Sequence, residues 1–155
     1  MPADPVQFCG TSVGRMSVKA RVLIVDDEPD VVVNWARVLS RDGHTCVTAT
    51  DGEHALALVE SERPDIVLLD LKMPGIDGMQ VLTRTLAVHA DAAVIVVTGH
   101  GAVESAVEAM LTGAIDYLLK PLPSNDMLRR AVQSALDRRR LIQENRRLRE
   151  PGMQG

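Results

Sequence analysis

The sequence has very few aromatic residues and no long apolar run. Aromatic side chains make up 2% of the 155 residues, so a folded core has to be built from valine, leucine, isoleucine, alanine and methionine. No apolar run approaches the ~20 residues that a membrane-spanning helix needs. The first twenty residues also lack the continuous apolar centre of a secretory signal. We therefore expect a cytoplasmic protein without a membrane segment.

Cysteine is also scarce, which limits the chemistry available to the chain. Cys9 and Cys46 match neither the spacing of a metal site nor that of a disulfide framework. Cys46 lies in an apolar, strand-like run, and we interpret it as a small buried side chain. A Gly-x-Gly-x-x-Gly turn after the first predicted strand is absent too, which argues against a dinucleotide-binding protein.

Five apolar segments alternate with five helical ones along the chain. Continuous apolar strands that alternate with helices are typical of a parallel sheet with helices on both faces. Right-handed crossovers favour the strand order 2-1-3-4-5, a doubly wound, flavodoxin-like α/β fold. Strands are expected at residues 21–25, 45–49, 66–70, 93–98 and 115–119, and helices at about 29–41, 51–60, 78–88, 103–111 and 125–149.

Several turn and cap signals fix these boundaries. Thr50 and Glu53 have the spacing of a capping box, with Thr50 at the cap. Asp77 is expected to cap the third helix and Ser124 the last one. Pro29 suits the first turn of the first helix, where its missing N–H costs nothing.

The chain divides into three parts by composition and charge. Residues 1–20 show no clear period and are interpreted as a mobile leader, residues 21–138 as one domain, and residues 139–155 as a helical linker and tail. Residues 1–128 carry 9 Lys and Arg against 18 Asp and Glu, whereas residues 129–155 carry 8 Arg against 3 acidic residues. An acidic body is thus followed by a basic helix.

Polar residues stand at the carboxyl ends of four predicted strands, where α/β sheets bind their ligands. They are Asp26 with Asp27, Asp70, Thr98 and Lys120. Each alone could mark only the point where a buried strand reaches solvent. Their coincidence at one crevice favours a site.

The residue types at this crevice permit a specific chemistry. Clustered carboxylates with room for water are typical of an Mg²⁺ site rather than a zinc site. One carboxylate in such a site can attack phosphorus and form an aspartyl-phosphate. An ammonium and a hydroxyl would then hold the charged phosphoryl oxygens.

Four segments together resemble the receiver domain of two-component response regulators. They read VLIVDDE at 22–28, LLDLKMP at 68–74, VTG at 97–99 and YLLKP at 117–121, in order and without gaps over about residues 20 to 138. The resemblance implies that Asp70 is the phosphoacceptor, supplied by a sensor histidine kinase. It further implies that Asp26, Asp27, Asp70 and the backbone carbonyl of Lys72 bind Mg²⁺.

The resemblance also implies a switch and a cis bond. Thr98 and Lys120 would hold the phosphoryl group, and the Tyr117 ring would turn inward when Thr98 moves toward it. The Lys120–Pro121 bond would be cis. Lys72 and His100 occupy positions that tune phosphoryl lifetime within the family, although an exposed loop histidine is the simpler interpretation of His100.

The last helix continues beyond what covering the sheet requires. Leu141, Asn145 and Leu148 have the d, a, d spacing of a heptad, with an Asn that could fix the register of a parallel homodimer. The sequence LIQENRRLR resembles the connector of NtrC-type transcription activators, so DNA would be reached only through an output domain outside this chain. Direct contact of the arginines with nucleic acid is the alternative, but no base-reading motif accompanies them.

The predicted function is a phosphorylation-switched receiver module and not an enzyme in its own right. Because residues 150–152 are expected to end the helix, either a piece of a larger regulator or a stand-alone receiver fits, and we favour the former. A phosphatase of the haloacid dehalogenase kind is the runner-up. That group has Asp-x-Asp after its first strand, whereas here the acceptor follows the third strand and Lys72 takes the second position.

Overall fold

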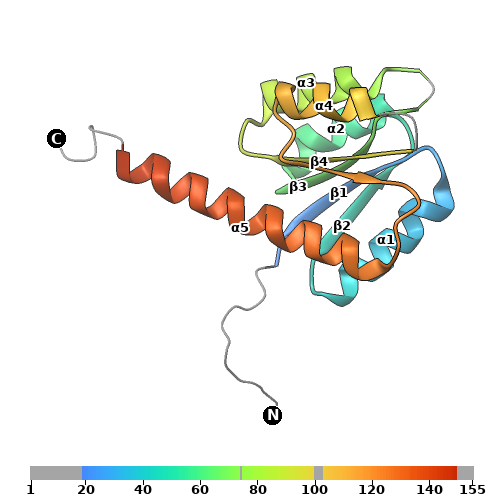
Figure 1. The fold of residues 1–155 in the computed structure, drawn as a ribbon, viewed down its shortest axis with the longest axis horizontal. Helices are drawn as coiled ribbons and strands as arrows, with labels where there is room; N and C mark the ends of the chain where they lie inside the picture. Colours follow the sequence, from blue (N-terminus) through green and yellow to red (C-terminus); the bar gives the residue numbers. More distant parts are fainter. Residues whose placement is uncertain (1–18, 74, 100–102, 150–155) are drawn as a thin grey trace, which may run out of the picture.

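The structure is a computed structural model of the chain, and it describes residues 19–73, 75–99 and 103–149. Strands and helices alternate through this part of the chain, as the sequence predicts (Figure 1). The strands are β1 (Arg21–Val25), β2 (Thr45–Ala49), β3 (Ile66–Asp70), β4 (Ala93–Thr98) and β5 (Asp116–Leu119). The helices are α1 (Pro29–Arg41), α2 (Gly52–Glu62), α3 (Gly78–Val88), α4 (Val103–Thr112) and α5 (Asn125–Arg149).

The strands form one parallel sheet in the order β2-β1-β3-β4-β5, which confirms the predicted topology. Helices α1 and α5 cover one face, and α2, α3 and α4 cover the other (Figure 1). Alternate residues of each inner strand enter the two cores, as Ile24 and Val25 do. Burial on both faces explains why the inner strands are apolar throughout.

Most predicted helix contacts are present. The apolar face of α1 is buried as expected, including Trp35, and so is the first half of α5 from Leu128 to Ala135. No helix within the described ranges is both long enough and apolar enough to cross a membrane.

The predicted cap of α2 is wrong by one residue. The N-cap is Asp51, whose Oδ1 accepts a hydrogen bond from the backbone N–H of His54 at 2.7 Å, so Thr50 and Glu53 do not form the capping box. Both Thr and Asp are good caps, and the point at which the chain leaves β2 decides between them. The cap of α3 is Asp77, as predicted, and it accepts from Met79 N–H at 3.1 Å.

Smaller differences concern strand β5 and the described cysteine. β5 begins at Asp116, one residue later than predicted. Cys46 is half-buried and not fully buried, because β2 is an edge strand that the helices cover less completely. Burial nevertheless raises the pKa of its thiol.

Helix α5 is the longest element, with 25 residues and a length of about 38 Å at 1.5 Å per residue. Its first half lies against the sheet, and its second half extends past the edge of the sheet at which the strands begin (Figure 1). Residues 1–18 of the predicted leader and the residues from 150 onward lie outside the described residues. The last leader residue, Ala20, is buried, and its N–H donates to His44 Nδ1 at 3.0 Å, so the ordered domain begins before Arg21.

Candidate functional site

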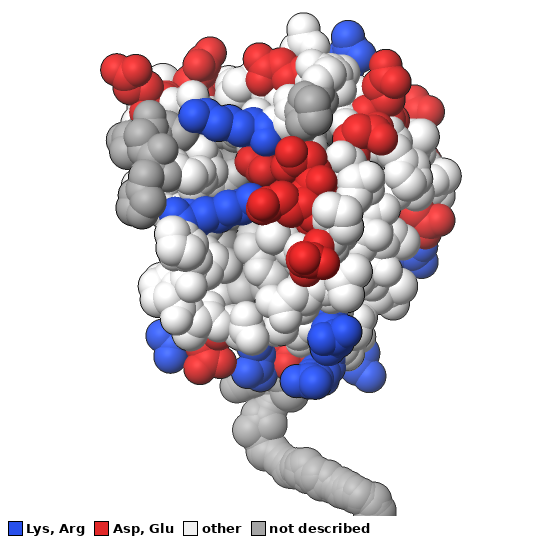
Figure 2. Space-filling view, turned by 90° about the vertical axis from the view of Figure 1, so that its right-hand side faces the viewer, with Lys and Arg blue, Asp and Glu red and all other residues white. Residues whose placement is uncertain are grey.

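The four polar strand ends of the sequence prediction lie at one edge of the sheet. Asp70 ends β3 and Thr98 ends β4, while Asp26 and Lys120 directly follow β1 and β5. The parallel register aligns these ends, since Asp70 pairs with Val97 on the neighbouring strand. Figure 2 shows this edge, where acidic side chains gather at the centre and basic side chains reach them from one side.

Lys120 joins the carboxylates of this cluster. Its Nζ lies 2.5 Å from Asp26 Oδ2 and 3.3 Å from Asp70 Oδ2, and 3.9 Å from Glu28 Oε1. Asp26 and Asp70 are buried, whereas Glu28 is largely exposed. The ammonium therefore neutralises part of the charge that two buried carboxylates bring to one place.

The second oxygen of each buried carboxylate is held by the backbone. Asp26 Oδ1 accepts from Glu28 N–H at 3.0 Å, and Asp70 Oδ1 accepts from Lys72 N–H at 3.0 Å. In each case the donor lies two residues further along the chain, where the strand turns into a loop. The two carboxylates are thus oriented before any ligand arrives.

The pKa values in this cluster reflect both burial and charge. Burial raises the pKa of the Asp70 carboxyl, against the opposing effects of the Lys72 N–H and the Lys120 charge. For Lys120, burial acts to lower the pKa, but the hydrogen bond to Asp26 and the charge of Asp70 outweigh it, so its pKa is raised. Lys120 is therefore fully protonated at neutral pH.

Three carboxylates could hold a metal ion. One oxygen from each of Asp26, Asp27 and Asp70 lies within 4.8 Å of the others. Asp27 is exposed, so the group opens to solvent and leaves room for water ligands. Hard oxygen donors in this arrangement fit Mg²⁺. The carbonyl of Lys72 stays a predicted ligand, and its side chain is exposed.

Thr98 provides a polar group without a partner. Its side chain is completely buried, and its Oγ1 has no hydrogen-bond partner among the described residues. Its backbone carbonyl accepts from Lys120 N–H at 2.7 Å, which ties the end of β4 to the residue after β5. The Oγ1 of Thr85, away from this edge, is also buried without a partner among the described residues, so only its position beside the carboxylates makes Thr98 a candidate ligand contact.

The predicted switch residue Tyr117 lies on β5, two residues before the register partner of Thr98. Its side chain is 40% exposed and lines a surface groove with Pro121, Met127 and Arg130. The Lys120–Pro121 bond is cis, as predicted. His100, the other predicted variable position, lies outside the described residues.

Two features of the site were missed in the sequence. Glu28 lies close to Lys120, and the acidic run that begins at Asp26 was its only signal. Gly78 lies so close to the chain after Asp70 that a Cβ there would be 2.5 Å from the Leu71 Cα. The Asp77-Gly78 pair indicates a helix start, but it carries no sign of this contact.

Comparisons with known proteins agree with this geometry. The family described as response regulator receiver domain matches residues 22–133. The C4-dicarboxylate transport transcriptional regulatory protein DctD of Pseudomonas aeruginosa is 41% identical over 131 residues, which are 84% of this chain and 28% of that protein. The transcriptional regulatory protein TcrA of Mycobacterium tuberculosis is 39% identical over 130 residues, 84% of this chain and 50% of that protein.

A solved structure extends the comparison to the fold. The crystal structure of NtrX from Brucella abortus in complex with ADP has a TM-score of 0.81 and 36% identity, covering 86% of this chain and 30% of that one. DctD and NtrX are regulators of the NtrC type, the group that the last helix of this chain resembles. The chain spans no more than half the length of these relatives.

The match also bears on the phosphatase alternative left by the sequence. The receiver family covers the strands that carry Asp26, Asp70, Thr98 and Lys120, so the haloacid dehalogenase alternative finds no support. The relatives are transcriptional regulators and hence signalling proteins. The chain belongs to the response regulator receiver domain family.

Proposed function

We propose that this receiver domain accepts a phosphoryl group on Asp70 from a sensor histidine kinase and thereby controls transcription through an output domain. The buried cluster around Lys120 is the observation that carries the proposal. It combines an oriented carboxylate, a fixed ammonium and an unpaired hydroxyl at one strand edge. Family membership and the transcriptional regulators among the relatives support the signalling role.

Each residue has a distinct role in the proposed reaction. Asp70 supplies the attacking oxygen, and the bond to the donor's leaving group breaks as the new O–P bond forms. Asp26, Asp27, Asp70 and the carbonyl of Lys72 would hold Mg²⁺, which neutralises charge on the phosphoryl oxygens.

Lys120 and Thr98 act on the product. Lys120 exchanges its bond to Asp26 for one to a phosphoryl oxygen, and it need not travel far because it already contacts Asp70. Thr98 Oγ1 gains the partner it lacks by moving toward the phosphoryl group. The space that it leaves lets the exposed Tyr117 ring turn inward, so phosphorylation shifts the population between two states.

Acetyl phosphate with Mg²⁺ provides the test of the reaction. The full chain should gain the mass of one phosphoryl group, and Asp70→Asn should gain none. Asp51→Asn is the matched control, because it removes an exposed carboxylate at the same sheet edge and keeps a residue that caps α2 equally well. If Asp70→Asn is modified as fast as the native chain, the proposal fails.

We further propose that residues 21–138 act as the receiver, that 139–155 act as the connector, and that two copies pair through the second half of α5. The NtrC-type relatives and the exposed Leu141 support this arrangement. DNA would be contacted by an output domain, because the relatives are more than twice as long as the segment that matches this chain. A stand-alone receiver in a phosphorelay is the alternative, and the length of the natural gene product distinguishes the two.

A further inference from the structure

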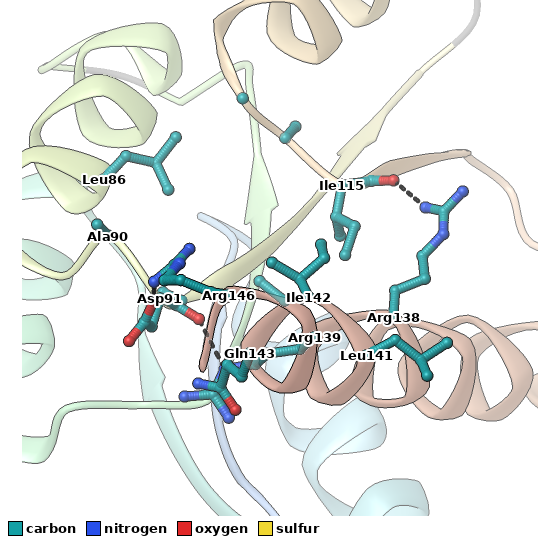
Figure 3. Close-up of a pocket in the computed structure, with 14 residues that line it drawn as sticks. Leu86, Ala90, Asp91, Ile115, Arg138, Arg139, Leu141, Ile142, Gln143 and Arg146 are labelled. Atoms are coloured by element: carbon teal, nitrogen blue, oxygen red, sulfur yellow. Dashed lines mark hydrogen bonds and ion pairs between the residues drawn. The ribbon is translucent and has the colours of Figure 1, made fainter. Parts of the chain in front are cut away.

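The second half of α5 stays attached to the domain after its last buried turn. Arg139 makes the central contact: its Nε donates to the carbonyl of Asp91 at 2.6 Å, and its Nη1 lies 3.3 Å from Asp65 Oδ1 (Figure 3 shows the surroundings). Its side chain is 21% exposed, which is low for an arginine on a helix that passes the sheet edge. A partly buried arginine with two acceptors is held more firmly than a surface ion pair.

Two further arginines of α5 add contacts beside that of Arg139. Arg138 donates from Nη1 to the carbonyl of Ile115, the residue directly before β5. Arg146 places its Nη1 2.9 Å from Asp91 Oδ1, two turns further on, and this bond lowers the pKa of the Asp91 carboxyl. Arg140, in contrast, is exposed and has no ion pair with any described residue.

The acceptors of these arginines lie just before three strands. Asp65 precedes β3, Asp91 lies two residues before β4, and Ile115 precedes β5. The same three strands end at Asp70, at Thr98 and next to Lys120. Helix α5 therefore holds one end of the strands whose other ends form the candidate phosphorylation site.

The spacing of the contacts shows which side of the helix faces the domain. Arg139, Ile142 and Arg146 follow at three- and four-residue intervals, so they lie on one side, toward the domain. Ile142 lines a groove of about 600 Å³ whose other wall includes Leu86 and Ile115 (Figure 3). Leu141 also lines this groove but is 60% exposed, so it stays accessible for the predicted pairing.

We propose that Arg138, Arg139 and Arg146 form an arginine clasp that docks the second half of α5 onto the strand-start edge of the sheet. The clasp fixes the direction in which the helix leaves the domain. The first residues of the predicted linker are thus held against the domain, and the exposed Leu141 and Asn145 are presented in a fixed orientation. This inference does not require Asp70 to be phosphorylated.

Hydrogen exchange of the backbone amides, followed by mass spectrometry, tests the clasp in the full chain. Because a short helix without tertiary contacts is marginal in water, undocked amides at 140–147 should exchange quickly. The double variant Arg139→Gln/Arg146→Gln should exchange at least about tenfold faster there, while residues 21–135 keep their native protection. Arg140→Gln removes one charge from the same turn and should behave like the native chain. The protein is kept at a concentration at which sedimentation shows a monomer.

A charge exchange provides an independent second test. Asp91→Lys should speed exchange at 140–147, and adding Arg146→Glu should restore protection by reversing the ion pair. If Arg139→Gln/Arg146→Gln loses protection throughout the chain, the charge exchange decides the question. Asp91→Lys with Arg146→Glu keeps the numbers of positive and negative charges. Equal rates at 140–147 in the native chain and the double variant, or no recovery in the charge exchange, would overturn the proposal.

Discussion

At the scale of single residues, the buried carboxylates of Asp26 and Asp70 accept the same two kinds of hydrogen bond. Each accepts a backbone N–H with one oxygen and the Lys120 ammonium with the other. This arrangement orients the oxygens at a cost, because the raised pKa of Asp70 means that its ionised form is disfavoured in the fold. The ionised Asp70 carboxylate therefore lowers the stability of the fold.

Replacing Asp70 with asparagine should stabilise the protein at neutral pH. The folded-state pKa of Asp70 is raised above its ordinary 3.8, so the folded protein holds this proton more tightly than the unfolded chain. Stability from this group is therefore greatest below pH 3.8 and is lost as the pH rises through the folded-state pKa. Asp70→Asn should raise the unfolding free energy by roughly 0.5–2 kcal/mol in urea at neutral pH.

The pH dependence distinguishes this cause from a general packing effect. The gain should shrink as the buffer becomes mildly acidic, because the native carboxyl then becomes neutral too. Asp51→Asn should stay within about 0.5 kcal/mol of the native chain at either pH. A gain that does not change with pH would contradict the electrostatic explanation.

Lys120 competes with any cation for the oxygens of Asp26 and Asp70. Removing its charge in Lys120→Met should strengthen Mg²⁺ binding by about tenfold, because the carboxylates lose their internal counter-ion. Trp35 is the single tryptophan and lines a groove with Lys120, so its fluorescence can follow the titration. Lys120→Arg keeps the charge and should bind like the native chain, and a weaker affinity in Lys120→Met would refute the competition.

At the scale of elements, the short segment between β3 and α3 brings the start of α3 back to the residue that follows Asp70. Gly78, the first residue of α3, packs against the backbone of Leu71. The neighbouring N–H of Lys72 is the group that orients Asp70. The start of α3 and the orientation of the acceptor therefore depend on the same close approach.

Gly78→Ala should destabilise the fold by about 1–3 kcal/mol, the range for overpacking. The added Cβ would meet backbone atoms of Leu71 at 2.5 to 2.8 Å, and backbone cannot turn aside as a side chain can. Urea unfolding measures the effect. Gly99→Ala is the control, since a Cβ there meets no atom of the described residues within 4 Å, and similar losses in the two variants would show that the contact is unimportant.

At the scale of the whole molecule, α5 joins the domain to whatever lies beyond it. Its first half belongs to the core, its arginine side holds the strand starts, and Leu141 and Asn145 remain exposed. The side chain of Leu148, the last predicted heptad position, lies outside the described side chains. Pairing of two copies would use these residues, which stay exposed beside the arginine clasp.

Leu141→Lys should weaken this pairing without affecting the fold. The side chain is 60% exposed, so the change adds a charge to the pairing surface and leaves the core intact. Sedimentation at tens of micromolar should show a dimer for the native chain and a monomer for the variant. Arg140→Lys, which keeps a charge on the same turn, should sediment like the native chain, and equal masses for native chain and Leu141→Lys would remove the pairing claim.

The sequence by itself determined the fold and predicted which strand ends lie at one edge of the sheet. Apolar runs that end in Asp70 or Thr98 indicate strands buried on both faces, and a parallel sheet brings such ends to one edge. These are local patterns with a fixed geometric consequence. Where two local choices were equally good, as with Thr50 and Asp51 at the start of α2, the sequence did not decide.

Only the tertiary structure decided which groups touch. Lys120 and Asp26 are 94 positions apart, and Arg139 meets Asp65 and Asp91 from a helix that looks like a solvated linker in sequence. Such contacts depend on strand order and helix direction, which bring distant side chains within a few ångströms. The spacing of arginines along a helix does not indicate which distant residues they contact. The attachment of α5 to the strand starts could therefore be found only in the folded structure.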